Sequence, residues 1–280
     1  MTLIQADTII ARVRELPALP AVVMELIQSL GDDDMNADQL AKKISNDQAL
    51  AAKTLRLANS SFYGMSRQVT SITDATAILG LRTLRSVAMA AGLAGSFPAT
   101  VNGGFDFKAF WRHSIGTALC ARALAAALRR EEEIAFTLGL LHDIGRLALA
   151  TAFPEQFAKT LAHQRANDLL PMDAERSVLG TDHAAVGGLI AEHWRFSPAI
   201  VQAITSHHAP ADGDEANLAD LLHVADNMAH ALDMSRQEDD AVPPLSMPAW
   251  SRLALDEARC KQVFRQAETQ HESVCQALLT

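Results

Sequence analysis

Aromatic residues make up only 5% of this 280-residue sequence, and segments in which Val, Ile or Thr alternate with polar residues are nearly absent. Strands are enriched in such residues, whereas Ala and Leu, which recur throughout the chain, favour helices. Charged residues account for 20% and apolar residues for 49%, enough to bury a large core in one or two closely packed units. We therefore expect a globular all-α fold.

Cysteine is also scarce, with three residues scattered along the chain and no paired spacing. That pattern argues against a disulfide framework and a thiolate zinc site, and we interpret the three as core thiols. Long apolar runs are missing too: Val87 to Leu93 and Ile134 to Leu141 are far shorter than the roughly 20 residues of a membrane span. The N-terminus carries Asp7 and no basic leader, unlike a signal peptide. These features predict a cytoplasmic protein without membrane association.

The net charge of -9 argues against a general affinity for polyanions. Charge is nevertheless uneven, because basic residues exceed acidic ones between 36 and 100 and acidic residues dominate between 151 and 240. The basic segment is the one feature that would suit nucleic acid or an acidic partner. Such spacing is also usual on solvated helix faces, so we do not expect a nucleic-acid partner.

Apolar periodicity and turn residues predict a series of helices along the chain. Pro17 and Pro20 precede an apolar-periodic run that should end at Gly31. Two short helices should follow, broken near Ser45 to Asp47, where a side chain can cap the second. After Ser71 the pattern is again helical. The first hundred residues thus predict a bundle of short helices without a catalytic constellation.

Turn formers are concentrated between Ser96 and Phe107, which predicts a boundary between two lobes. We expect an N-terminal helical lobe at 14–105 and a helical core at 106–235. The remainder, 236–280, should form an acidic, Pro-containing linker and an amphipathic helix. The apolar stripe of that helix is expected to pack within the chain.

The most informative pattern is an ordered set of histidines and aspartates. Imidazole nitrogen and carboxylate oxygen are the ligands that borderline divalent cations accept, and a pair of such ions activates water for attack on phosphorus. The members of the set are His113, His142, Asp143, His183, His207, His208 and Asp226. Neighbours on a helix point about 100° apart, so the adjacent His-Asp pair suits one pocket if a helix ends there, as the nearby Gly145 suggests. The set predicts a site for one or two ions of iron, manganese or zinc.

Any one of these histidines, taken alone, is better explained as a core or surface imidazole than as a ligand. The ordered set changes that balance, because buried polar groups are costly unless they have partners. His163, His193 and His271 lie outside the set, and we interpret them as structural. His223 and His230 lie three residues before and four after Asp226, so they are either supports of the ligands or surface groups.

At the level of motifs, the sequence resembles the HDOD domains, regulatory relatives of the HD and HD-GYP metal-dependent phosphohydrolases. The resemblance covers roughly residues 14 to 235. It is carried by "LPALP" (16–20), "ISNDQALAAKTLRLANSSFYG" (44–64), "SITDATAILGLRTLRSV" (71–87), "FWRHS" (110–114), "LGLLHDIGRL" (138–147), "DHAAVGGLIAEHW" (182–194), "AIVQAITSHH" (199–208) and "LLHVADNMA" (221–229). It implies a two-lobed helical fold, with an N-terminal bundle packed on an HD-like core, and a role in bacterial signalling.

Carried onto this sequence, the ligand roles of the HD superfamily fall into two sets: His113, His142, Asp143 and Asp226 for the first metal, and His183, His207 and His208 for the second. Asp143 and Arg146 become the candidate catalytic residues, with Asp143 bridging two ions. Arg146 stands where lysine is common and can clamp a phosphate. No Gly-Tyr-Pro follows His208, which argues against hydrolysis of cyclic-di-GMP.

Two functions of different classes follow. The first is a regulatory output module that binds a partner protein or a small phosphorylated ligand such as a nucleotide, and that keeps an HD-type metal site. The second is an active dinuclear-metal phosphohydrolase, a phosphodiesterase or phosphatase, in which the seven ligands hold two ions and Arg146 binds the substrate phosphate. Sequence favours the regulatory module, since a fold does not fix a function.

Overall fold

The computed structural model describes residues 8–9, 11–12, 20–29, 36–60, 62–64, 67–96, 104–238 and 240–280. Each secondary-structure element in these ranges is a helix, which confirms the expected all-α fold. The helices are α2 (Ala21–Gln28), α3 (Ala37–Asn46), α4 (Gln48–Ala58), α5 (Ile72–Leu79), α6 (Leu81–Ser96), α7 (Phe107–Ala127), α8 (Glu132–Leu141), α9 (Ile144–Ala152), α10 (Pro154–Asn167), α11 (Pro171–Leu179), α12 (His183–His193), α13 (Pro198–Ser206), α14 (Leu218–Ala231), α15 (Met247–Leu253) and α16 (Glu257–Leu279).

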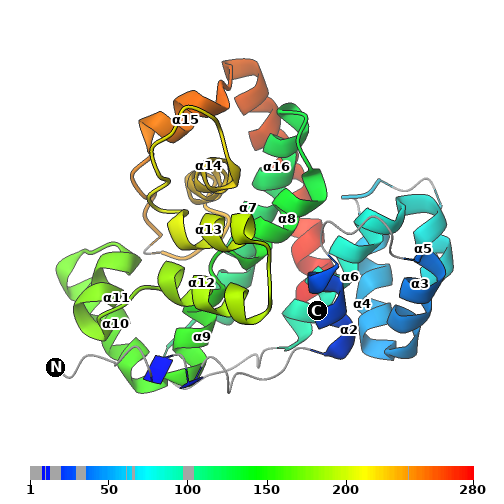
Figure 1. Cartoon of the computed structure of the whole chain (residues 1–280), viewed down its shortest axis with the longest axis horizontal. Helices are drawn as coiled ribbons and strands as arrows, with labels where there is room; N and C mark the ends of the chain where they lie inside the picture. Colours follow the sequence, from blue (N-terminus) through cyan, green and yellow to red (C-terminus); the bar gives the residue numbers. More distant parts are fainter. Residues whose placement is uncertain are drawn as a thin grey trace.

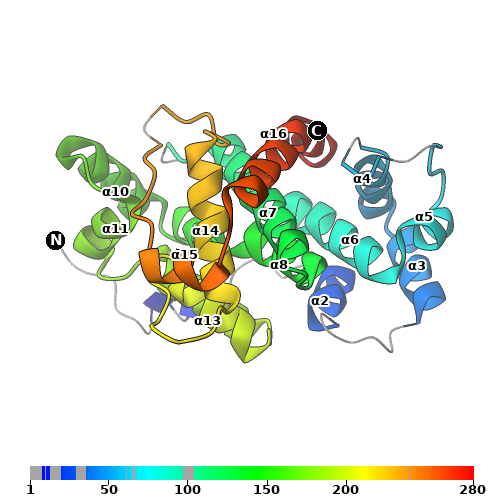
Figure 2. The same cartoon turned by 90° about the horizontal axis from the view of Figure 1, so that it is seen from above.

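Helices from the first hundred residues gather at one end of the molecule. Figures 1 and 2 show α3, α4 and α5 at this end and α10 and α11 at the opposite end, with α7, α8 and α16 between them. Helix α16, at the C-terminal end of the chain, packs along α7 and also contacts α4 and α6. The chain therefore returns to its N-terminal helices after completing the core.

Helix α7 is the centre of the core. It is buried along nearly its whole length and packs against α8, α14 and α16. A helix that is shielded on all sides can carry apolar residues around its full circumference, as α7 does. A polar residue on α7, such as His113, is therefore held deep inside the protein rather than at its surface.

The N-terminal helices follow the expected pattern with one correction. The break between α3 and α4 falls at Asp47, whose side chain accepts the backbone N–H of Leu50, as the sequence predicted. The stretch after Ser71 is helical as expected, but it is divided at Gly80 into α5 and α6, a break that the sequence pattern did not predict. Gly80 has φ of 77°, a conformation in which glycine is unhindered and a helix cannot continue.

The predictions for Leu16 to Leu19, for a helix end at Gly31 and for the turn-rich residues 97–103 lie outside the described residues. The lobe boundaries 14–105, 106–235 and 236–280 stay predictions. In the C-terminal part the apolar stripe packs inside the chain as expected, with Val263 and Val274 of α16 fully or almost fully buried.

One apolar stretch in the described residues, Glu132–Ala152, is long enough by composition to cross a membrane. It consists of α8 and α9, and 83% of its most apolar part is buried inside the protein. A buried core helix can have the same length and apolar composition as a membrane-spanning helix. In this fold the stretch packs as part of the core.

The junction of α8 and α9 positions the central part of the site. Helix α8 ends at Leu141, His142 and Asp143 form the junction, and α9 begins at Ile144. Two residues later, Gly145 packs against α12 so closely that a Cβ atom there would collide with the carbonyl oxygen of His183. The predicted end of a helix at the His-Asp pair is confirmed, and glycine allows the two backbones to approach.

Candidate metal centre

All seven predicted ligands meet in the core, although five separate parts of the fold supply them. His113 comes from α7, the His-Asp pair from the α8–α9 junction, His183 from the start of α12, the His-His pair from the end of α13, and Asp226 from α14. Six of the seven are buried, and His208 is partly exposed. Whether each binds a metal stays a prediction, but the spatial convergence that such binding requires is present.

The first group surrounds one carboxylate oxygen. Asp226 Oδ1 lies 2.9 Å from His113 Nε2 and 3.4 Å from His142 Nε2. The two imidazole Nε2 atoms are 3.3 Å apart. Two ligand atoms about 2.1 Å from one ion, at ordinary bond angles, are separated by roughly 3.0–3.4 Å. These three atoms are therefore spaced like the ligands of a single cation.

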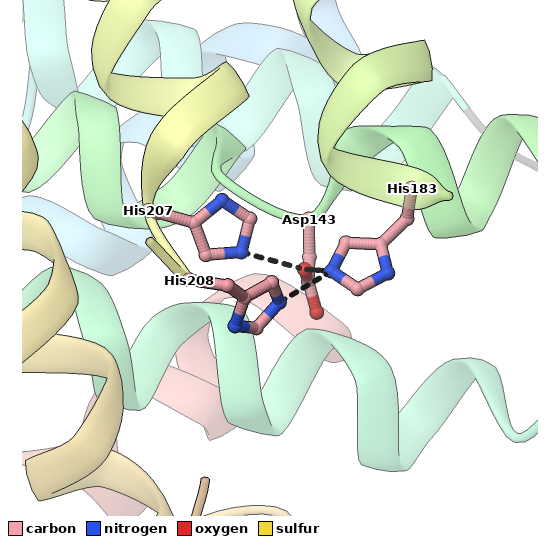
Figure 3. Close-up of side chains that lie close together, drawn as sticks. All are labelled: Asp143, His183, His207 and His208. Carbon is pink, nitrogen blue, oxygen red and sulfur yellow. Dashed lines mark hydrogen bonds and ion pairs between the residues drawn. The ribbon is translucent and has the colours of Figure 1, made fainter. Parts of the chain in front are cut away.

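The second group surrounds Asp143, as Figure 3 shows. Asp143 Oδ1 lies 3.2 Å from His183 Nε2 and 3.7 Å from His207 Nε2. His208 Nε2 lies 2.7 Å from His183 Nε2. One carboxylate and three imidazoles form a four-ligand set that suits a borderline divalent cation.

Asp143 lies between the two groups. The resemblance assigned Asp143 to the first metal. The imidazole closest to its Oδ1 atom is that of His183, in the second group. His142 Nε2, in the first group, lies 3.6 Å from the same atom. This position is compatible with the bridging role expected for Asp143.

Three of the histidines are oriented by hydrogen bonds from outside the site. His142 donates its Nδ1 hydrogen to the carbonyl of Gly139 at 2.8 Å, and His207 donates its own to the carbonyl of Ile204 at 2.7 Å. His183 Nδ1 lies 2.6 Å from Glu175 Oε2. An imidazole that donates from Nδ1 presents the Nε2 lone pair to the opposite side, which here is the interior of the site.

Several polar atoms in the site are buried without a hydrogen-bond partner. They include both carboxylate oxygens of Asp226, Oδ1 of Asp143 and Nε2 of His207. Buried acceptors without a partner cost free energy, and buried carboxylates cost most. A divalent cation satisfies such acceptors directly, so the donor set fits a metal.

The two carboxylates are held ionised. Burial alone would raise the pKa of Asp143, but the charges of His142 and His183 outweigh burial and lower that pKa well below its usual value. The pKa of Asp226 is likewise far below normal, since His230 and His113 outweigh its burial. Ionised carboxylates are the form that binds cations.

Two of the imidazoles are held neutral. Burial, followed by the charges of His142 and His183, lowers the pKa of His207 to about 4. Burial and the neighbouring His207 also lower the pKa of His208. Neutral imidazole is the form that binds metal ions, so both rings are ready to act as ligands near neutral pH.

Arg146 lies beside the second group. Its Nη1 is 3.7 Å from Asp143 Oδ2, its Nε is 3.9 Å from Glu175 Oε1, and its buried Nε has no hydrogen-bond partner. The side chain lines a cavity of about 180 Å³ together with Asp143, His183, His208 and Asp226. A guanidinium with an unused donor, facing a cavity, is suited to a phosphate oxygen.

The far wall of this cavity is largely apolar. The segment Leu169–Met172 forms one side, and Pro243 and Pro244 of the linker form part of another. A ligand whose phosphoryl group faces the histidines and Arg146 would therefore place its remaining atoms against apolar surface.

Three residues of the site were missed or left undecided by sequence reasoning. Glu175 was not singled out; its Oε2 accepts both the Nδ1 hydrogen and the backbone N–H of His183, the latter at 2.8 Å. His230 lies at the first group, and Asp240 hydrogen-bonds to it. No motif marks Glu175 or Asp240, whereas the spacing of His230 from Asp226 was a usable signal.

The other histidines belong to neither metal group. His223 donates from Nδ1 to the carbonyl of His207 and accepts the backbone N–H of Ser246 at Nε2. His163, His193 and His271 belong to none of the potential metal-binding groups found among the described residues. Their interpretation as residues outside the site agrees with this arrangement.

Comparison with known proteins places this geometry in context. The HDOD domain family model matches residues 16–210. A Treponema pallidum (strain Nichols) protein of uncharacterised function is 27% identical over 205 residues, which are 72% of this chain and 39% of that protein. The chain thus spans less than half the length of this curated relative.

Solved structures match nearly the whole chain. A Shewanella amazonensis SB2B protein, named provisionally as a phosphohydrolase, is 29% identical with a TM-score of 0.76, covering 97% of this chain and 98% of that one. An HDOD domain protein of unknown function from Geobacter sulfurreducens is 24% identical with a TM-score of 0.84, covering 99% and 100%. The second likeness concerns the fold alone.

Proposed function

The chain belongs to the HDOD domain family, and on that premise we propose that it is a bacterial regulatory protein whose HD-type site binds two divalent ions and a phosphorylated ligand. The observation that carries the proposal is the burial of three carboxylate oxygens, Asp143 Oδ1 and both oxygens of Asp226, that make no hydrogen bond and belong to groups rich in imidazole nitrogens. A packed core tolerates such atoms poorly without a cation. Iron, manganese and zinc all suit these ligands.

The site residues have different roles toward a phosphorylated ligand. When bound, divalent ions supply Lewis acidity to a phosphoryl group and lower the pKa of water. Arg146 donates to a phosphate oxygen and holds the ligand in the cavity. Asp143 lies between the two groups of imidazoles and fixes their separation. The apolar wall at Leu169–Met172 excludes water from the rest of the ligand.

Two uses of this site are consistent with the family. As a phosphohydrolase, the protein would cleave a phosphomonoester or phosphodiester held by Arg146. As an output module, it would bind a phosphorylated ligand such as a nucleotide, or a regulatory protein partner, without turnover. Convergence of all seven ligand positions beside a cavity that Asp143, His183, His208 and Asp226 line favours hydrolysis more than the sequence alone did. The output module keeps the same metals and the same ligand site.

We further propose a cytoplasmic location. The extensive burial of Glu132–Ala152, the one apolar stretch of membrane-spanning length in the described residues, supports this placement.

Metal analysis combined with turnover tests the proposal. Protein purified without chelator should contain about two equivalents of iron, manganese or zinc and should hydrolyse at least one of p-nitrophenyl phosphate, bis-p-nitrophenyl phosphate or a nucleotide panel. The double variant His142→Ala/Asp143→Ala should lose both metal and turnover. His163→Ala, whose ring lies outside the metal groups, is the matched control and should keep both.

The outcomes separate the two uses. Bound metal with phosphate binding but no turnover would assign the output module. Absence of metal at saturating concentrations would contradict the proposal in both forms.

A further inference from the structure

Two histidines on α14 flank Asp226, and the contacts of their ring nitrogens differ. His223 precedes Asp226 by three residues and His230 follows it by four. Both nitrogens of His223 are occupied, by the carbonyl of His207 and by the backbone N–H of Ser246. His230 has one nitrogen occupied and turns the other toward the carboxylate of Asp226.

His230 shares the orientation of the predicted ligands. His142, His183 and His207 each engage an acceptor through Nδ1 and direct Nε2 into the site. His230 does the same, with Nδ1 2.6 Å from Asp240 Oδ1 and Nε2 3.5 Å from Asp226 Oδ1. A carboxylate behind an imidazole is a common support for a metal-binding histidine. The pair Asp240–His230 thus repeats, at the first group, the relation of Glu175 to His183 at the second.

Three imidazoles then face one carboxylate oxygen. His113 Nε2, His142 Nε2 and His230 Nε2 lie 2.9, 3.4 and 3.5 Å from Asp226 Oδ1. The rings of His113 and His230 are adjacent, with centroids 4.3 Å apart. With Asp226 these residues have the same composition as the second group, three imidazoles and one carboxylate.

Asp240 is better explained as a support than as a ligand of a separate ion. It also lies with His113 and His230 in a group close enough to surround a cation. Its 2.6 Å separation from His230 Nδ1 is, however, a hydrogen-bond length, shorter than the roughly 3 Å between two ligands of one ion. Its other oxygen accepts the hydroxyl hydrogen of Ser235 at 2.6 Å, so both oxygens are engaged.

Residues near Asp240 also line the cavity. They are Gln237, Asp240, Ala241, Pro243 and Pro244. The linker predicted from the sequence therefore lines the cavity and also supplies the hydrogen-bond partner of His230.

We propose that His230 is a fourth protein ligand of the first metal and that Asp240 orients it, so that Asp240 is part of the metal centre. The inference rests on the proposed metal site. It adds one ligand and one positioning residue that the HD-type set of seven does not contain.

Metal titration of purified, metal-free full-length protein with Mn²⁺ tests this assignment. Wild-type protein should bind two equivalents. His230→Gln should keep one tight site and lose at least about 100-fold affinity at the other, because a neutral amide replaces a ligand. Asp240→Asn should bind two ions at saturation with about 10- to 100-fold weaker affinity at one site, the usual effect of removing an orienting carboxylate.

His223→Gln is the matched control, since this histidine lies on the same helix and flanks Asp226 on the other side. It should retain two equivalents and the wild-type affinity at the first site. Circular dichroism and thermal unfolding of every variant verify that the helical fold is intact. A crystal structure with Mn²⁺ should place His230 Nε2 about 2.0–2.3 Å from the ion.

Two results would overturn the inference alone: His230→Gln with two sites of wild-type affinity, or a third ion in wild type that Asp240→Asn abolishes. Wild-type protein that binds no Mn²⁺ would overturn the proposed metal site as well. The failure of the inference and the failure of the proposed function are thus distinct.

Discussion

Glu175 Oε2 binds both the Nδ1 hydrogen of His183, at 2.6 Å, and the backbone N–H of the same residue, at 2.8 Å. One carboxylate oxygen therefore fixes the ring and the first peptide of α12 together. Glu175 is itself almost completely buried, and its Oε1 lies 3.9 Å from Arg146 Nε. The second group of ligands is held in place by a residue that does not belong to it.

Replacement of Glu175 by glutamine tests this support. Glu175→Gln keeps the shape of the side chain and removes its charge, so the imidazole of His183 becomes a weaker ligand. We expect Mn²⁺ affinity at one of the two sites to fall about 10- to 100-fold while the fold is retained. Isothermal titration calorimetry measures the change. Glu155→Gln, on the partly exposed start of α10, is the control, and equal affinities for both variants would contradict the assigned role.

Gly145 sets the distance between α9 and α12. Gly145→Ala would drive a methyl group into the carbonyl of His183, and we expect a loss of about 1–3 kcal/mol in the free energy of unfolding together with weaker metal binding. Urea denaturation of the chelator-treated protein measures the first effect. Gly213→Ala is the control, because a Cβ there has no atom within 4 Å and should change stability by less than about 0.5 kcal/mol. Similar midpoints for the two variants would refute the close-packing argument.

The metal-free protein should be most stable near pH 6.5. Burial, and then the charges of His142 and His183, lower the pKa of His207 to about 4. Burial alone would also lower the pKa of His142, but the charges of Asp143 and Asp226 outweigh burial and raise that pKa to about 9. The stability from neutral His207 is complete above its ordinary pKa of 6.5 and is lost as pH falls toward 4. The stability from charged His142 is complete below 6.5 and is lost as pH rises toward 9.

Each of these two contributions is at most about 3 kcal/mol. Urea denaturation with chelator across this pH range measures the sum, and a free energy of unfolding that increases steadily up to pH 9 would be inconsistent with it. Saturating Mn²⁺ should remove the alkaline decline, since a bound cation replaces the proton of His142.

Arg146 should act on phosphate rather than on metal. Arg146→Lys keeps the charge but loses the two-point donor geometry, and Arg146→Ala loses both. We expect the inhibition or dissociation constant for inorganic phosphate to rise about 10-fold in the first variant and about 100-fold in the second, from the loss of one charge-assisted hydrogen bond and then the other. Metal content measured by mass spectrometry should stay at the wild-type value. A loss of metal in Arg146→Lys would show instead that the arginine supports Asp143.

The all-α class was accessible from sequence because it depends on local signals. The convergence of the histidines was accessible because their order along the chain resembles that of a known family. Apolar periodicity specified the helices around His113 and Asp226, and the glycine after the His-Asp pair indicated that a helix ended there. The break at Gly80 was missed because a glycine within an apolar-periodic run is usually tolerated in a helix. Its positive φ is a property of the folded backbone.

Glu175 and Asp240 could not be predicted in the same way. Each carboxylate lies in a segment without a motif and becomes part of the site only when tertiary packing brings α11 or the linker to a histidine. The status of His230 was undecided for a similar reason. Spacing placed it near Asp226, but only the folded structure distinguishes it from His223: Nε2 of His230 faces Asp226, whereas Nε2 of His223 accepts a backbone N–H.

A crystal structure of the full chain grown with Mn²⁺, with data collected for anomalous scattering, tests the central claim most directly. The account predicts two anomalous peaks, one between His113, His142 and Asp226 and the other between Asp143, His183, His207 and His208. The absence of peaks at both positions, with the same side chains hydrogen-bonded only to one another or to water, would contradict it.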